Sequence, residues 1–158
     1  MKLLKIFLIL IVSFLITDTC YSQEPYVVVA LAKIRNNCGE GTYLGYAYSY
    51  GAYKNEADIK DKAKEMVIRS NPAYKNITRE KKIETVDNYS WSKCKGTYMV
   101  IITATTRDKD DQCDEIAFGV GFGANRNIAE SEAIENLEVN NWDWEKEQGY
   151  SVVEHKAF

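Results

Sequence analysis

The sequence contains a single histidine, His155, in the C-terminal segment Val152-Val-Glu-His-Lys-Ala-Phe158. Nucleophilic catalysis by a Ser/His or Cys/His pair needs a base within hydrogen-bond reach of the nucleophile and a third group that orients the base. Nothing in the sequence assigns such partners to His155, so we interpret it as a surface residue of a strand. Catalysis by carboxylates alone, as in a carboxylate-dependent hydrolase, is kept as a remote alternative.

Metal and cofactor motifs are weak. The cysteines lack the paired short spacings of a zinc site, and Gly119-Val-Gly121-Phe-Gly123 matches the dinucleotide fingerprint outside its usual parallel βαβ context. We therefore expect neither cofactor nor metal. An acidic segment provides a weak calcium alternative, although it lacks the glycine and distal glutamate of an EF-hand loop; its carboxylates are Asp108, Asp110, Asp111 and Asp114.

Aromatic and acidic residues are the stronger candidates, and they indicate binding. Trp142 and Trp144 follow a glutamate-rich segment that includes Glu132 and Glu135. Tryptophan is enriched at binding hot spots, and acidic side chains speed encounter with a cationic partner. The alternatives are that the tryptophans cover the core and that the glutamates form a solvated helix face. Eleven tyrosines are also present, among them the alternating set Tyr46, Tyr48 and Tyr50.

These residues are carried by an internal repeat. A shift of 72 residues aligns Tyr26–Asp58 with Tyr98–Glu130 without a gap, and eight of the 33 positions are identical. Two copies indicate a duplicated half-domain rather than a solenoid, which needs at least three repeats.

Each copy predicts the order ββαβ. The β-branched runs Tyr26–Arg35 and Tyr98–Arg107 predict strands, and the alternating runs Thr42–Gly51 and Asp114–Gly123 predict their hairpin partners. Asn55 and Asn127 are the expected helix N-caps. In the first helix, Ile59, Ala63, Met66 and Val67 form the expected apolar stripe. Third strands are expected around Lys82–Asn88 and Tyr150–Lys156.

The alternating strands have one bulky face and one nearly bare face, because side chains alternate across a pleat. The bare faces consist of small residues: Gly45, Ala47, Ser49 and Gly51 in the first copy, and Ala117, Gly119, Gly121 and Gly123 in the second. Close approach of a helix would explain them. A shallow groove for a ligand or partner, with the tyrosines at its rim, is the alternative.

We therefore predict an α+β fold made of two pseudo-twofold-related ββαβ repeats, with one antiparallel sheet and two helices packed on one of its faces. Residues 23–158 would form a single domain with halves at 26–92 and 98–158. If the first strands of the halves run side by side, Cys38 approaches Cys94, which predicts a disulfide and leaves Cys113 over.

The N-terminus reads as a secretory signal. Lys2 and Lys5 precede the apolar run Ile6–Ile16, and Ser22 offers a small residue before a cleavage site. We expect a signal peptide over residues 1–22 and a secreted or periplasmic protein; an uncleaved anchor and lipidation of Cys20 are alternatives. The remaining chain carries 18 basic and 22 acidic side chains, a net charge of −4, which disfavours nucleic acid as a partner.

Together these features favour a non-catalytic exported binding protein, such as an inhibitor, immunity-type or accessory factor that docks another macromolecule, with another protein as the expected partner. The second hypothesis is a small-ligand or glycan binder that uses a Tyr/Trp-lined groove.

Overall fold

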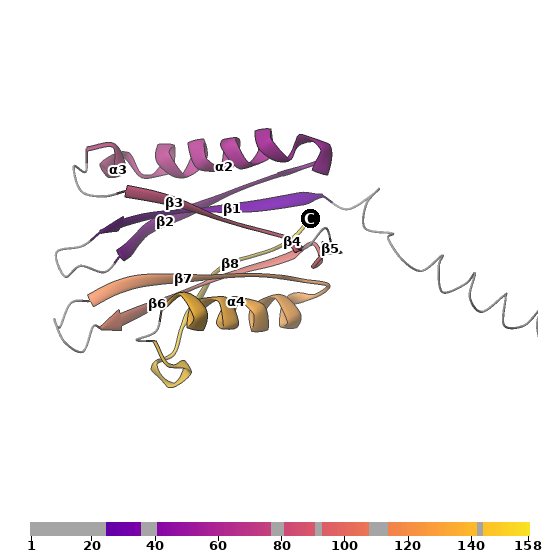
Figure 1. Cartoon of the computed structure of the whole chain (residues 1–158). Helices are drawn as coiled ribbons and strands as arrows, with labels where there is room; N and C mark the ends of the chain where they lie inside the picture. Colours follow the sequence, from indigo (N-terminus) through magenta and orange to yellow (C-terminus); the bar gives the residue numbers. More distant parts are fainter. Residues whose placement is uncertain (1–24, 36–40, 77–80, 91–92, 108–113, 142–143) are drawn as a thin grey trace, which may run out of the picture.

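A computed structural model describes residues 25–35, 41–76, 81–90, 93–107, 114–141 and 144–158. Two three-stranded antiparallel sheets form the body of the protein (Figure 1). The first has the order β2-β1-β3, and the second has the order β7-β6-β8. The elements in chain order are β1 (Tyr26–Arg35), β2 (Gly41–Gly51), η2 (Tyr53–Asn55), α2 (Glu56–Ser70), α3 (Pro72–Asn76), β3 (Lys81–Asp87), β4 (Tyr89–Ser90), β5 (Lys93–Cys94), β6 (Tyr98–Arg107), β7 (Asp114–Gly123), α4 (Arg126–Asn140), η3 (Lys146–Gln148) and β8 (Ser151–Ala157).

The two sheets face each other, with α2 on the outer face of the first and α4 on the outer face of the second (Figure 1). Val27 and Val29 of β1 meet Met99 and Ile101 of β6 in a core between the sheets. The alternate residues of both strands pack outward under the helices. The prediction of one shared sheet with both helices on one face is therefore wrong. Strands β1 and β6 are buried on both faces, so each sheet needs a cover on each side.

Both halves of the chain have the order of long elements that the repeat predicts, to which the structure adds the short η2, α3 and η3 and the small β4–β5 hairpin. The hairpin registers also correspond, because Tyr26 pairs with Gly51 and Tyr98 pairs with Gly123. The β-branched runs predicted β1 and β6, and alternation predicted β2 and β7, each to within one residue of the observed bounds.

One predicted helix boundary is wrong. The N-cap of α4 is Asn125 rather than Asn127, and its side chain accepts a hydrogen bond from the backbone N–H of Ile128 at 3.1 Å. A capping asparagine satisfies a backbone donor that the first helical turn leaves unpaired. For α2 the N-cap is Asn55, as predicted, although its side chain makes no capping hydrogen bond.

Asn88 joins the two halves. Its side chain is fully buried; Oδ1 accepts from Val27 N–H at 2.8 Å, and Nδ2 donates to the carbonyls of Pro25 and Gly96. The amide thus connects the start of β1 to the segment that enters β6. Buried polar groups of this kind are hydrogen-bonded because leaving them unpaired is costly.

Among the described residues, no helix is long and apolar enough to span a membrane.

Candidate functional site

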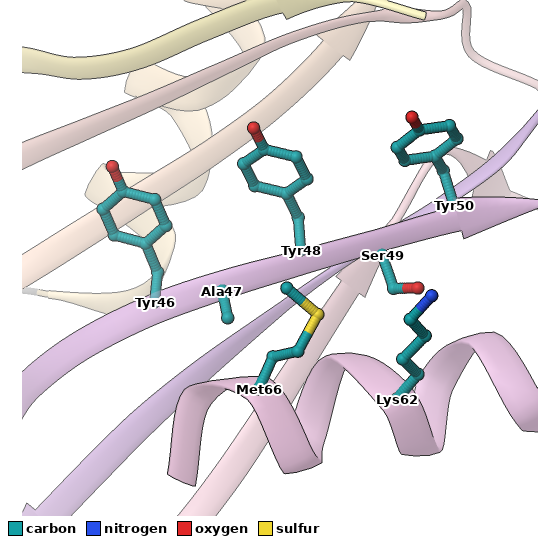
Figure 2. Close-up of a pocket in the computed structure, with 7 residues that line it drawn as sticks. All are labelled: Tyr46, Ala47, Tyr48, Ser49, Tyr50, Lys62 and Met66. Atoms are coloured by element: carbon teal, nitrogen blue, oxygen red, sulfur yellow. The ribbon is translucent and has the colours of Figure 1, made fainter. Parts of the chain in front are cut away.

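A groove of about 580 Å³ runs along β2 beside α2 (Figure 2). Its lining residues are Tyr46, Ala47, Tyr48, Ser49, Tyr50, Lys62 and Met66. The three tyrosines project from one face of β2, whereas Ala47 and Ser49 project from the other face toward α2 (Figure 2). Lys62 and Met66 lie one helical turn apart on α2 and reach toward the strand. The groove therefore combines an aromatic row, an adaptable thioether and a cation.

The small-residue faces of β2 and β7 differ in side-chain size, and this difference explains why the groove lies beside β2 and not beside β7. At Gly119 and Gly121 of β7, an added Cβ would lie 2.1 Å from the carbonyl oxygen of Ala133 and 2.0 Å from that of Ala129. Helix α4 thus rests directly on the glycines of β7. The positions 72 residues earlier hold Ala47 and Ser49, whose side chains occupy the space between β2 and α2.

The sequence left two explanations for the bare strand faces, close packing of a helix and a groove, and each applies to one of the two strands. Close helix packing is confirmed for β7 by the short distances at Gly119 and Gly121. In β2, two residues of the bare face, Ala47 and Ser49, line the groove together with the tyrosines.

Contacts with the second half hold the tyrosine row in place. The Tyr46 ring lies 5.6 Å from that of Phe118, edge to face, and its hydroxyl donates to the Val153 carbonyl at 3.4 Å. Burial and the nearby Glu154 carboxylate raise the pKa of Tyr46 above its ordinary value. Such contacts fix ring orientation before any ligand arrives.

The rings of Tyr48 and Tyr50 both contact a lysine of β8. Lys156 Nζ lies 5.1 Å from the ring centres of Tyr48 and Tyr50 and 4.9 Å from that of Phe158. Phe158 also contacts both tyrosine rings, at 5.8 and 4.8 Å between centres. Cation–π attraction in this cluster supports the rings from the side of the second sheet. Tyr50 nevertheless keeps 53% of its surface exposed, whereas Tyr46 and Tyr48 are partly buried against the core between the sheets.

Lys62 differs from the other cations of α2. Lys60 pairs with Glu56 and Asp87, Lys64 with Asp61, and Arg69 with Glu65. In the described parts of the chain, no carboxylate forms an ion pair with Lys62. The groove therefore presents a positive charge at its helical wall.

The other predicted binding residues lie away from this groove. Trp144 is only 3% exposed, belongs to the core between α4 and the second sheet, and donates its Nε1–H to the Gly149 carbonyl at 3.1 Å. Its apolar surface is buried, as in the alternative that Trp144 covers the core, so in this structure Trp144 offers little surface to a partner. Its neighbour Trp142 lies outside the described residues.

Two of the four glutamates of α4 were predicted to bind a partner, and the structure uses them differently. Glu132 accepts a hydrogen bond from the Phe122 N–H at 3.2 Å and pairs with Lys95. Glu135 is exposed on the helix. One of the two acidic candidates is therefore engaged in holding α4 on β7.

Two predicted sites, the disulfide and the calcium alternative, lie wholly or partly outside the described residues. Cys38 and Cys113 lie outside, so the pairing of Cys38 with Cys94 stays a prediction; Cys94 Sγ lies 3.9 Å from Asn88 Nδ2. Of the calcium alternative, Asp114 alone is described, exposed at the start of β7, whereas Asp108, Asp110 and Asp111 are not. Within the described ranges, no group of three or more Cys, His, Asp or Glu side chains gathers as metal ligands would.

His155 is exposed on β8, as interpreted from the sequence, and its Nδ1 lies 3.2 Å from the Tyr98 hydroxyl. A pair of carboxylates does meet at another place: Glu56 and Asp87 both contact Lys60 and the Tyr26 hydroxyl. The hydrogen bond from Lys60 is the main cause of the lowered pKa of Glu56. This cluster ties α2 to the end of β3 through ion pairs.

Sequence reasoning missed Lys62 and placed Met66 in the apolar core stripe, whereas Met66 is 40% exposed in the groove. The available signal was that Ala47 and Ser49 stand where the second copy has glycines. Their larger side chains hold the helix farther from the strand, which leaves room for a groove.

In comparisons with protein-family models, curated proteins and solved structures, the chain matches none of them.

Proposed function

We propose that this protein is an exported, non-catalytic binding protein that docks another protein through the groove between β2 and α2. The tyrosine row carries this proposal, since its three residues line a groove together with Met66 and Lys62, and Tyr50 is exposed. Aromatic residues and methionine are enriched where proteins bind one another, and methionine adapts to partners of different shape.

Photo-crosslinking tests the docking site. A benzoylphenylalanine introduced in place of Met66 should capture one discrete protein in the native host. The same group in place of Val139, which is 65% exposed on α4, serves as the control. Equal capture at both positions, or capture of nothing at Met66, would contradict the proposal.

The same groove supports a second candidate, a small-ligand or glycan binder. Sugar rings stack on aromatic side chains, and Tyr48 and Tyr50 stand in a row that Lys156 and Phe158 hold in place. Native mass spectrometry of the protein from its host distinguishes the two candidates. A bound small molecule that is lost in Tyr48→Ala/Tyr50→Ala, together with no protein crosslink at Met66, would favour this second candidate.

Export and duplication complete the proposal. We infer a signal peptide over residues 1–22, so the N-terminus of the protein isolated from its host should be Gln23. We also infer that the halves derive from one ββαβ unit and are related by an approximate twofold axis, which their shared order and hairpin register support. An experimental structure in which Tyr26–Asp58 and Tyr98–Glu130 fail to superpose would contradict the duplication.

A further inference from the structure

The backbone of β2 has one edge that β1 does not use. Asn88 accepts from Val27 N–H through its side chain and donates its own N–H to the Val27 carbonyl at 3.1 Å, so Val27 directs both backbone groups away from β2. Val27 is opposite Tyr50 in the register. Because hydrogen-bonded and non-hydrogen-bonded pairs alternate in an antiparallel ladder, Tyr46, Tyr48 and Tyr50 direct their N–H and C=O groups outward from the sheet.

The equivalent edge of β7 is closed by side chains. Val120 N–H donates to Asn136 Oδ1 at 3.0 Å, and Phe122 N–H donates to Glu132 Oε2 at 3.2 Å. Farther along, Ile116 N–H donates to Thr42 Oγ1 at 2.9 Å. An edge strand that is capped in this way cannot pair with another chain.

Helix α2 cannot cap β2 by the same means. The positions that correspond to Glu132 and Asn136, 72 residues earlier, are Lys60 and Lys64. An ammonium group donates hydrogen bonds and cannot accept one from a backbone N–H. Within the described ranges, no side chain accepts from the amides of Tyr46, Tyr48 or Tyr50.

The charge at the groove specifies the chemistry of an occupant. Lys62 is the cation of α2 that the described residues leave without a carboxylate, and it lies on the side of the edge toward which Ala47 and Ser49 project. A strand added to β2 would place alternate side chains on this side. An acidic side chain there would supply the counter-charge, and a neighbouring apolar side chain would contact Met66.

We propose that an extended segment of the partner protein adds to β2 as a fourth strand of the sheet, pairing with Tyr46–Tyr50 and placing an acidic side chain beside Lys62. The inference rests on the docking function proposed above and names its mode. Main-chain hydrogen bonds provide the affinity in this type of recognition, and side-chain positions on alternate faces provide the specificity. The paired stretch would be about five residues, or ~17 Å at the rise of a strand.

Three synthetic nine-residue peptides test the pairing. The first alternates valine and threonine around a central glutamate, the second carries lysine in place of that glutamate, and the third is the glutamate peptide with alternate backbone nitrogens methylated. Amide spectra of the ¹⁵N-labelled protein report which residues respond. We expect the glutamate peptide to shift the amides of Tyr46, Tyr48 and Tyr50, the lysine peptide to bind about threefold to fivefold more weakly, and the methylated peptide not to bind.

A charge reversal provides the matched control. Lys62→Glu should invert the preference so that the lysine peptide binds more tightly, whereas Lys75→Glu, an exposed change on α3 outside the groove, should leave the preference unchanged. Strand addition is overturned if the methylated peptide binds as well as its parent, if the shifts lie elsewhere, or if none of the peptides binds.

The partner captured at Met66 separates this inference from the docking proposal. Protection of the Tyr46, Tyr48 and Tyr50 amides from hydrogen exchange in that complex supports strand addition. Capture at Met66 without such protection leaves docking in place and refutes strand addition.

Discussion

Replacing Gly121 with alanine should strongly destabilise the second half of the protein. The added Cβ would lie 2.0 Å from the Ala129 carbonyl oxygen and 2.3 Å from the Ala133 nitrogen. Both atoms belong to the backbone of α4 and cannot move aside singly. Since ordinary contacts at a Cβ begin at 3.4 Å, the helix would have to withdraw by about 1 Å or more from the strand.

The expected magnitude follows from two contributions. Overpacking of a core costs about 1–3 kcal/mol, and the rigid obstruction favours the upper part of that range. Withdrawal of α4 would also break the bonds from Val120 N–H to Asn136 and from Phe122 N–H to Glu132, at about 1 kcal/mol each. We expect a loss of about 3–5 kcal/mol in the free energy of unfolding, a large part of the ~5–15 kcal/mol typical of a domain.

Urea denaturation followed by tryptophan fluorescence measures this loss, which should lower the midpoint by about 2 M. Gly45→Ala on β2 is the matched control, because its Cβ would meet the end of the Asn71 side chain at 2.9 Å, and that side chain can move. We expect the control to lose less than about 1 kcal/mol. If Gly121→Ala is no more destabilising than Gly45→Ala, the direct contact between α4 and β7 is refuted.

Three further substitutions test the core. Asn88→Ala should cost about 2–4 kcal/mol in a urea titration, because it leaves buried backbone groups unpaired; a loss below 1 kcal/mol would contradict its joining role. Tyr43→Phe should flatten the acid limb of a stability–pH curve. Burial disfavours the Glu84 carboxylate, but hydrogen bonds led by that from Tyr43, at 2.7 Å, outweigh it and leave the Glu84 pKa below its ordinary 4.5. A carboxyl whose pKa is lower in the folded than in the unfolded protein stabilises the fold at pH values above the unfolded pKa, and this stabilisation is lost as the pH falls through the folded pKa. An acid limb that is the same in Tyr43→Phe and the parent protein would therefore count against the Tyr43–Glu84 hydrogen bond. Trp144→Phe should lower the thermal midpoint by removing the bond to Gly149, whereas an unchanged midpoint would mean that this bond adds nothing.

The sequence predicted the strands well and the layers poorly. Alternation located β2 and β7 and indicated which of their side chains share a face, because a shift of one residue in the pairing would turn every side chain to the other face. The number of sheets did not follow from pairing patterns within each copy. A signal was nevertheless present: the continuous apolar run Tyr26–Ala32 is typical of a strand that is covered on both faces. A helix covers one face, so a second sheet was the natural cover for the other.

The candidate site was predicted in part. The tyrosines were found because alternation placed Tyr46, Tyr48 and Tyr50 on one face of a strand. Lys62 and Met66 were not found, because a helix pattern gives the core stripe but not the distance between helix and strand. That distance depends on residues of the strand itself, through Ala47 and Ser49. The burial of Trp144 likewise depends on how the segment between α4 and β8 folds back, which no short-range pattern specifies.

The core between the two sheets has a consequence for how the chain acquires its structure. During synthesis from the N-terminus, β1, β2 and β3 are complete before β6 exists, so the face that carries Val27, Val29 and Leu31 has nothing to pack against. That face is covered only after Met99, Ile101 and the strand that follows them have been made. A nascent chain that stops at residue 87 therefore exposes an apolar sheet surface to which holding chaperones bind. The first sheet therefore remains prone to aggregation until the second sheet has been translated and covers it.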